Sequence, residues 1–358
     1  MESSFYDGTK LLSLKDINGQ DPEIFICESN RSAGKTTYFN RLAFNRFFRG
    51  KVRKIAFLYR FNYELDACAD KIFKDIKDLF FPEYDLESKP CAKGIYHRLY
   101  ISSAETERNK QLKECGYAIA LNSADQIKKH SHLFSDIDLI IFDEFQSETG
   151  HYCPNEITKF ISVHTSIARG QGSQVRYVPV IMVSNPVSII NPYYSEMGIA
   201  ARLSEKTRFL KGAGFVLEKS FNAAASEAQQ GSGFFQAFAG NKYTQFSAQS
   251  IYLNDNLTFI SSPKDFGFSK YVCTIKYNGK DFAIREYPAA GIVYADQNAD
   301  LSFPLKLSVS VQDHDVNYLL LKNNDDIIAN LKYYFNHGCF RFKNLESKEA
   351  VFALIGIC

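Results

Sequence analysis

Short runs of apolar residues in the first half of the chain alternate with longer segments whose apolar side chains recur at helical spacing. The predicted strands are residues 23–27, 54–59, 137–142 and 178–183, and the predicted helices are residues 36–48, 62–80 and 155–169. Strands that are apolar along their whole length and are separated by helices indicate a parallel sheet covered on both faces. The pattern therefore predicts an α/β domain over residues 1–200.

The pattern changes after residue 200. Residues 201–219 predict a basic helix, and residues 222–262 are rich in Ala, Ser, Gln and Gly with little charge, so we expect a linker over residues 201–262. Beyond it, β-type runs at 271–277, 282–287 and 292–295 precede a predicted helix at 325–335. This order predicts a smaller α+β domain over residues 263–358.

Composition is that of a globular protein. A chain of 358 residues is too long for one ordinary core, which agrees with two domains. Its longest apolar runs are too short to span a membrane, and its first residues lack the pattern of a secretory signal, so we expect no membrane partner. The eight cysteines are scattered without a CxxC spacing, which favours reduced thiols over disulfides or zinc ligands.

Positive charge is concentrated near the start of the chain, although the formal net charge is only +2. Residues 30–63 contain no acidic side chain but many basic ones, which favours a polyanion nearby. Nucleotide phosphate would account for Lys35 and is a candidate partner of Arg31, whereas the others could face DNA, RNA or an acidic partner. If that polyanion is DNA, our candidates for contacting it are Arg46, Arg49, Lys51, Arg53 and Lys54, with Arg202, Lys206 and Arg208 as alternatives.

A phosphate-binding motif joins the first predicted strand to the first predicted helix. It consists of Ser29, Asn30, Arg31, Ser32, Ala33, Gly34, Lys35 and Thr36. This is the Walker A pattern with Ser29 in place of the first glycine. In such loops backbone N–H groups bind the phosphates of ATP, the lysine reaches the β and γ oxygens, and the hydroxyl binds Mg²⁺. We assign these roles to Lys35 and Thr36 and include the next residue, Thr37, among the ATP-binding residues.

Two adjacent carboxylates end the third predicted strand, as in a Walker B motif. Asp143 would hold Mg²⁺ through its water shell, and Glu144 would polarise the attacking water. A strand that ends in solvated acids is a common alternative when it is considered alone. With a phosphate loop upstream, the pair favours hydrolysis by water over transfer of the phosphoryl group to a substrate.

Two further positions have candidate roles in hydrolysis. Asn185 ends the fourth predicted strand and would sense the γ-phosphate, although an Asn-Pro turn explains it nearly as well. Arg169 precedes a glycine-rich stretch, residues 170–172, and would act as an arginine finger on the ATP of a neighbouring subunit. A plain surface arginine is an equal alternative, and Lys128 and Lys129 are weaker candidates for the same role.

Taken together, these motifs resemble the φ29-like bacteriophage DNA encapsidation (genome packaging) ATPases. The resemblance rests on NRSAGKT, IIFDEF, YCPNEI, MVSNPVSIINPYY and FNHGCFRFKN, in this order along the chain. It implies an additional-strand P-loop ATPase domain, a linker, and a C-terminal domain with a ribonuclease-H-like fold. It also implies a homomeric ring, a pentamer in that family, that acts on double-stranded DNA. The ring would form in the host cell cytoplasm and dock transiently on the portal vertex of a prohead, in some relatives through a structural RNA.

A nuclease of that fold would need several carboxylates around two metal ions. The first strand of the predicted C-terminal domain lacks the expected Asp, while Asp281, Asp296 and Asp300 form no convincing triad, so we interpret this domain as a vestigial nuclease. Two other functions stay open from the sequence. One is a different P-loop enzyme, such as a helicase or a small-molecule enzyme, and the other is a nucleotide-dependent assembly protein.

Overall fold

The computed structural model describes residues 5–68, 71–103, 112–169, 175–203, 207–261, 266–320 and 326–356. They form two compact units. The first contains Met1–Met197 and Leu203–Asn254, and the second contains Gly198–Arg202 and Asp255–Cys358. In the described parts of the chain, no helix is both long and apolar enough to span a membrane.

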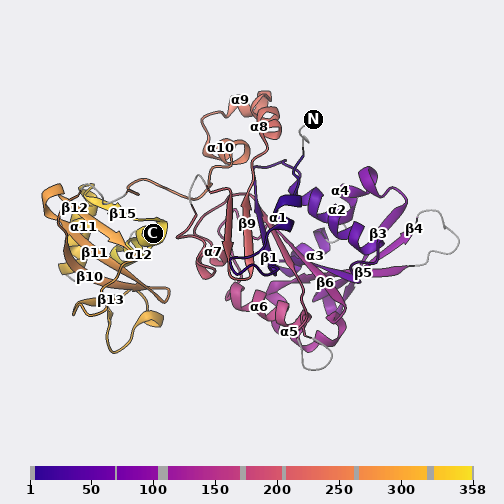
Figure 1. The fold of residues 1–358 in the computed structure, drawn as a ribbon, viewed down its shortest axis with the longest axis horizontal. Helices are drawn as coiled ribbons and strands as arrows, with labels where there is room; N and C mark the ends of the chain where they lie inside the picture. The colour runs from indigo at the N-terminus through magenta and orange to yellow at the C-terminus, as the bar shows by residue number, and fades with distance from the viewer. Residues whose placement is uncertain are drawn as a thin grey trace. The chain divides into compact units, whose positions relative to one another are not determined.

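A single mixed sheet forms the centre of the first unit (Figure 1). Its order is β3-β4-β5-β2-β6-β7-β1-β9-β8. The strands are β1 (Ile24–Glu28), β2 (Lys54–Tyr59), β3 (Tyr84–Cys91), β4 (Tyr96–Ser103), β5 (Lys113–Ala120), β6 (Ile137–Asp143), β7 (Val180–Ser184), β8 (Phe209–Gly212) and β9 (Phe215–Lys219). Strands from β5 to β9 in this order are parallel, and antiparallel strands flank them at both edges. The predicted parallel core is confirmed.

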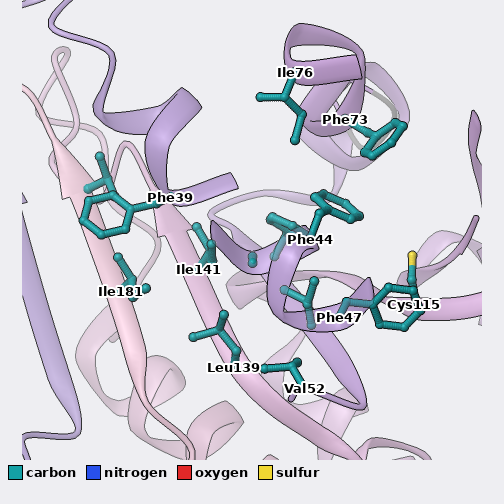
Figure 2. Close-up of a cluster of buried hydrophobic side chains, with 14 of the residues drawn as sticks. Phe39, Phe44, Phe47, Val52, Phe73, Ile76, Cys115, Leu139, Ile141 and Ile181 are labelled. Carbon is teal, nitrogen blue, oxygen red and sulfur yellow. The ribbon is translucent and has the colours of Figure 1, made fainter. Parts of the chain in front are cut away.

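Helices cover both faces of this sheet, with α2 and α4 on one side and α5 and α6 on the other (Figure 1). The helices of the first unit are α1 (Thr9–Ser13), α2 (Lys35–Phe48), α3 (Asn62–Cys68), α4 (Lys71–Phe80), α5 (Ala124–Lys129), α6 (Glu156–Ile167), α7 (Pro192–Glu196), α8 (Ala223–Gln230), α9 (Gly233–Ala237) and α10 (Lys242–Gln249). Figure 2 shows the aromatic side chains of α2 packed with Leu139 and Ile141 of β6 and Ile181 of β7. On the opposite face, the ring of Phe142 stacks with that of Phe160 in α6, with 6.0 Å between the ring centroids. Burial on both faces explains why these strands are apolar throughout.

The predicted helix over residues 201–219 is wrong. Strands β8 and β9 form a hairpin there, with Ala213 and Gly214 as its turn, and Gly214 has a φ of 75° that favours glycine. Strand β9 also pairs in parallel with β1, and this long-range pairing overrides the helical pattern. Most of the segment expected to be a linker, residues 201–262, thus contributes strands β8 and β9 and helices α8–α10 to the first unit.

The second unit contains one sheet of order β14-β13-β10-β11-β12-β15. Its elements are β10 (Lys270–Tyr277), β11 (Lys280–Tyr287), β12 (Ile292–Asp296), β13 (Lys306–Ser308), β14 (Leu319–Leu320), α11 (Asp326–Asn336), β15 (Phe340–Phe342) and α12 (Leu345–Ile355). β10, β11 and β12 are antiparallel, whereas β13 pairs in parallel with both β10 and β14. α11 and α12 pack on an apolar core that includes Phe282, Leu331 and Val351. The three predicted strands and the predicted helix of this region are all present.

Candidate nucleotide site

The phosphate loop lies between β1 and α2, at the edge of the sheet where the parallel strands end. Ser32 and Gly34 have left-handed backbone conformations, with φ of 61° and 91°, and α2 begins at Lys35. These reversals turn the chain tightly into the N-terminus of a helix, where free N–H groups attract anions. Ser29 is fully buried, and its N–H donates to the Ser184 carbonyl at 3.3 Å. A serine therefore fits where a glycine is usual.

The Lys35 ammonium group is held inside this loop. It is 7% exposed and donates to the Ser29 carbonyl at 3.3 Å and to Asn185 Oδ1 at 2.7 Å. Burial lowers the pKa of Lys35, while nearby acidic groups, Asp143 among them, oppose that shift. The structure thus brings Asn185 of the strand beyond Walker B to the phosphate-binding lysine, 150 residues away along the chain.

Oxygen ligands suited to Mg²⁺ lie beside Lys35. The Thr36 side chain hydrogen-bonds to the Asp143 carboxyl group at the end of β6. Burial raises the pKa of Asp143, and the Thr36 hydrogen bond and the Lys35 charge oppose that shift. A hydroxyl and one carboxylate are hard oxygen donors, the set that Mg²⁺ uses together with phosphates and water. These residues fit the metal expected from the sequence.

Glu144 follows Asp143 in a left-handed conformation, with φ of 54°. Its N–H donates to Asp143 Oδ1 at 2.9 Å, and its side chain lines a pocket of about 260 Å³ together with Asn185. Partial desolvation raises the pKa of Glu144, and the neighbouring carboxylates of Asp143 and Glu148 raise it further, whereas Arg31 lowers it. The strained turn directs Glu144 away from the β6 axis and into this pocket.

A second group of contacts supports the outer side of the phosphate loop. Arg31 forms an ion pair with Glu148 and lies over the rings of Tyr243 and Phe246 in α10, at 5.4 and 5.9 Å. Three further hydrogen bonds join the phosphate loop to the segment that contains α8 and α10. Asn30 Nδ2 donates to the Asn222 carbonyl, the Arg31 N–H donates to the Ser247 carbonyl, and Gln229 Nε2 donates to Ser32 Oγ. The sequence placed Arg31 on the nucleotide, but it gave no sign of these distant partners.

Arg60 anchors the far wall of the pocket and was not recognised as a site residue. Its Nε donates to Glu156 Oε2 at 2.9 Å, and its Nη2 donates to the Phe145 carbonyl at 2.7 Å, next to Glu144. Glu156 also accepts hydrogen bonds from the Tyr193 hydroxyl and the Cys153 N–H. An arginine directly after an apolar strand, at the same edge as the Walker motifs, was the available signal.

Arg169 lies at the other edge of the sheet. It is exposed, follows α6 and forms a β-bridge with Val175. The adjacent Arg176 donates to Asp138 at the start of β6, whereas Glu144 follows the end of β6. The structure therefore does not bring Arg169 to the nucleotide site of its own chain, and its role on a neighbouring subunit stays a prediction. The glycine-rich stretch 170–172 lies outside the described residues.

The other candidate cations differ in their surroundings. Lys128 and Lys129 are exposed at the end of α5. Arg53 binds Asp138 with two nitrogens, and Lys54 pairs with Glu114 and Asp136. Arg49, Lys51, Arg202 and Arg208 are exposed, Arg46 is half-buried, and Lys206 lies outside the described residues. Because carboxylates already neutralise Arg53 and Lys54, Arg49 and Lys51 are the stronger candidates for gripping a polyanion.

A phosphate loop, a Walker B strand ending in two carboxylates, and a third polar residue between them in the sheet define a P-loop nucleoside triphosphatase. The sequence profile of the podovirus DNA encapsidation protein (Gp16) family matches residues 1–356. The chain belongs to this family of phage DNA packaging proteins, and the resemblance seen in its motifs is confirmed.

Individual proteins and a solved structure are also similar to this chain. The chain is 26% identical over 358 residues to the DNA packaging protein of Bacillus phage phi29, covering 99% of this chain and 97% of that protein. It is 28% identical over 236 residues to the DNA packaging protein of Bacillus phage B103, covering 65% and 70%. Its fold is similar to a chain of the bacteriophage phi29 genome packaging motor assembly, with a TM-score of 0.70, 24% identity and 99% of both chains covered.

Proposed function

We propose that this chain hydrolyses ATP to translocate double-stranded DNA into a phage prohead. The observation that carries this proposal is the convergence of Lys35, Asp143 and Asn185 at one edge of the sheet, in a member of the encapsidation family. The protein would act in the host cell cytoplasm and would dock transiently on the portal vertex of the prohead. In some relatives a structural RNA mediates this attachment.

Binding of ATP follows from the charges and donors of the loop. Backbone N–H groups of residues 32–36 at the start of α2 bind the phosphates, and Lys35 exchanges its Asn185 contact for β and γ oxygens. Thr36 and Asp143 would hold Mg²⁺, which neutralises phosphate charge when it is bound. Asn185, released from Lys35, can then hydrogen-bond the γ-phosphate or the attacking water.

Hydrolysis requires a group that orients water for in-line attack. Glu144 lies in the pocket beside Asn185, and its raised pKa strengthens it as a proton acceptor once ionised. Arg31 opposes this rise in the pKa of Glu144. Positioning and charge stabilisation are the main contributions a protein makes to phosphoryl transfer, and this site supplies both.

A homomeric ring, a pentamer by family resemblance, would complete each site in trans. Arg169 lies far from its own Glu144 and is exposed, as a residue that reaches the ATP of a neighbour must be. An arginine finger is worth about a thousandfold or more in turnover. Mixing Arg169→Ala with Glu144→Gln subunits should restore activity, because some interfaces then pair both intact residues. Normal turnover by Arg169→Ala rings would shift the role to Lys128 or Lys129.

The second unit supports the interpretation of a vestigial ribonuclease-H-like domain. The order β12-β11-β10-β13-β14 has three antiparallel strands followed by two parallel ones, as that fold requires. Among the described residues, no group of three acidic, His or Cys side chains is placed to hold a metal ion. The carboxylates make separate contacts: Asp296 accepts from Arg285, Asp313 from the N–H groups of residues 278 and 279, and Asp281 from Tyr318. We propose that this unit binds and does not cut DNA.

Two substitutions test the hydrolytic proposal. Lys35→Ala should abolish nucleotide binding, whereas Glu144→Gln should bind ATP normally and hydrolyse it at least about a hundredfold more slowly. ATP turnover is measured with and without double-stranded DNA, beside assembly into rings. Stimulation by duplex DNA favours the motor, strand separation favours a helicase, and nucleotide-dependent assembly with negligible turnover favours an assembly protein.

A further inference from the structure

A buried carboxyl group lies immediately before the phosphate loop. Glu28 ends β1 and is 1% exposed. Its Oε1 accepts a hydrogen bond from Gln146 Nε2 at 2.5 Å, and its Oε2 accepts one from the Tyr252 hydroxyl at 2.9 Å. A buried carboxyl group without hydrogen-bond partners is costly. Glu28 therefore holds the Gln146 and Tyr252 side chains in the positions from which they donate to it.

Gln146 continues this network into both catalytic loops. It lies two residues after Glu144, and its Oε1 accepts hydrogen bonds from the N–H groups of Val187 and Ser188, at 3.1 and 3.0 Å. Those residues follow Asn185 and Pro186 in the same loop. One side chain that is 2% exposed therefore holds the Glu144 loop and the Asn185 loop in a fixed relation.

Tyr252 continues the network to the end of the first unit. We call residues 252–254 the exit segment, because Asn254 is the last residue of that unit and the chain from Asp255 on belongs to the other. The Leu253 N–H donates to the Pro186 carbonyl at 3.3 Å, and the Asn254 N–H donates to the Val187 carbonyl at 2.9 Å. The exit segment is thus paired with the loop that follows Asn185.

We propose that Glu28 and Tyr252 are positioning residues that transmit the state of the nucleotide site to the exit segment. The inference rests on the proposed function, in which Asn185 leaves Lys35 as ATP binds and Glu144 orients the attacking water. Movement of either loop shifts Gln146 or the paired backbone, and the Glu28 carboxyl group carries that shift to Tyr252. A buried hydrogen-bond network responds as a unit, because a member that moves loses hydrogen bonds to its neighbours.

Tyr252→Phe removes only the hydroxyl that joins Glu28 to the exit segment. Tyr6→Phe is a matched control, because the Tyr6 hydroxyl also donates to a buried carboxyl group, Glu218 Oε2, at 2.9 Å. The full-length chain is compared with and without a non-hydrolysable ATP analogue by amide hydrogen exchange. Binding should change the exchange of Leu253 and Asn254 by about fivefold or more in the wild type and in Tyr6→Phe. Tyr252→Phe should bind the analogue but lose that response.

Packaging into proheads gives a second readout. Tyr252→Phe should keep ATP turnover within about twofold of the wild type while packaging about fivefold less DNA per ATP. Gln146→Met breaks the same network. The double variant Tyr252→Phe/Gln146→Met should therefore package as much DNA per ATP as whichever single variant packages less. The inference is overturned if the analogue leaves amide exchange of the exit segment unchanged in a wild type that hydrolyses ATP. It is also overturned if Tyr6→Phe and Tyr252→Phe give the same exchange response to the analogue. A wild type that binds no ATP analogue would instead refute the proposed function itself.

Discussion

Replacing Arg60 by methionine removes one partner of the buried ion pair behind the pocket. Arg60 and Glu156 are 7% and 3% exposed, and the substitution leaves the Glu156 carboxylate without its cation. Breaking such a pair costs about 3–5 kcal/mol of unfolding free energy, because the remaining charge stays desolvated. For a unit of this size that loss lowers Tm by about 6–20 °C.

Arg53→Met is the matched control. Like Arg60, Arg53 pairs with a carboxylate, here through Nε and Nη2, but its side chain is 58% exposed. We therefore expect Arg53→Met to lose about 1 kcal/mol or less of unfolding free energy. Because the chain contains no tryptophan, unfolding is followed by calorimetry and circular dichroism.

The double variant Arg60→Met/Glu156→Met refines the test. It removes both charges, but the Tyr193 hydroxyl and the Cys153 N–H then lack their acceptor, at about 1–3 kcal/mol each. This penalty is of the same order as the gain from removing the unpaired charge, so we expect the double variant to stay well below the wild type in stability. If Arg60→Met costs no more than Arg53→Met, the pair is not the anchor that its geometry indicates.

Three further predictions concern pH, salt and the phosphate loop. Burial raises the pKa of Asp138, but hydrogen bonds from Arg53 outweigh this effect and lower it overall, so its stabilisation is present above the ordinary Asp pKa and is lost as pH falls through the depressed value. Denaturant titrations should show the wild type about 1 kcal/mol more stable than Asp138→Asn at pH 7, with the gap closing below about pH 4; a gap independent of pH would refute this. Arg49→Ala should reduce the slope of log affinity for duplex DNA against log salt by about 0.9, and Arg53→Ala should not; equal slopes would exclude Arg49 as a phosphate contact. Gly34→Ala should weaken ATP binding by about five- to thirtyfold in calorimetric titrations, because its φ is 91°, whereas Gly50→Ala, at φ 68° outside the loop, should bind ATP normally. Equal affinities in these two glycine variants would show that the loop tolerates a side chain there.

The places in the fold that were predicted correctly from the sequence are those set by consecutive residues. Lys35 and Thr36 must follow a strand and begin a helix, and Asp143 must end a strand, so short apolar runs placed all three. The parallel order of strands also followed, because apolar strands separated by helices have few other arrangements.

What the sequence did not predict depends on partners far along the chain. Strand β9 reads as part of a helix until β1 pairs with it, and only Gly214 signalled the turn before it. The Glu28 network was likewise invisible, since a glutamate at the end of an apolar strand looks solvated until Gln146 and Tyr252 are placed beside it. Arg169 was singled out by its neighbours in sequence, which carry no information about which edge of the sheet it occupies.

The position of β1 between two strands that come much later in the chain has a consequence for synthesis of the protein. Its two neighbours, β7 and β9, are synthesised roughly 155 and 190 residues after it. At about 5–20 residues per second, β1 therefore has no pairing partner for about 10–40 s. During that time Phe25, Ile26 and Cys27 form an apolar strand with two open edges, which is a hazard for aggregation. A nascent chain or truncated product that stops before residue 215 keeps one of those edges open permanently. Correct assembly of this protein in the host therefore depends on how quickly the ribosome reaches β9 and on what shields β1 until then.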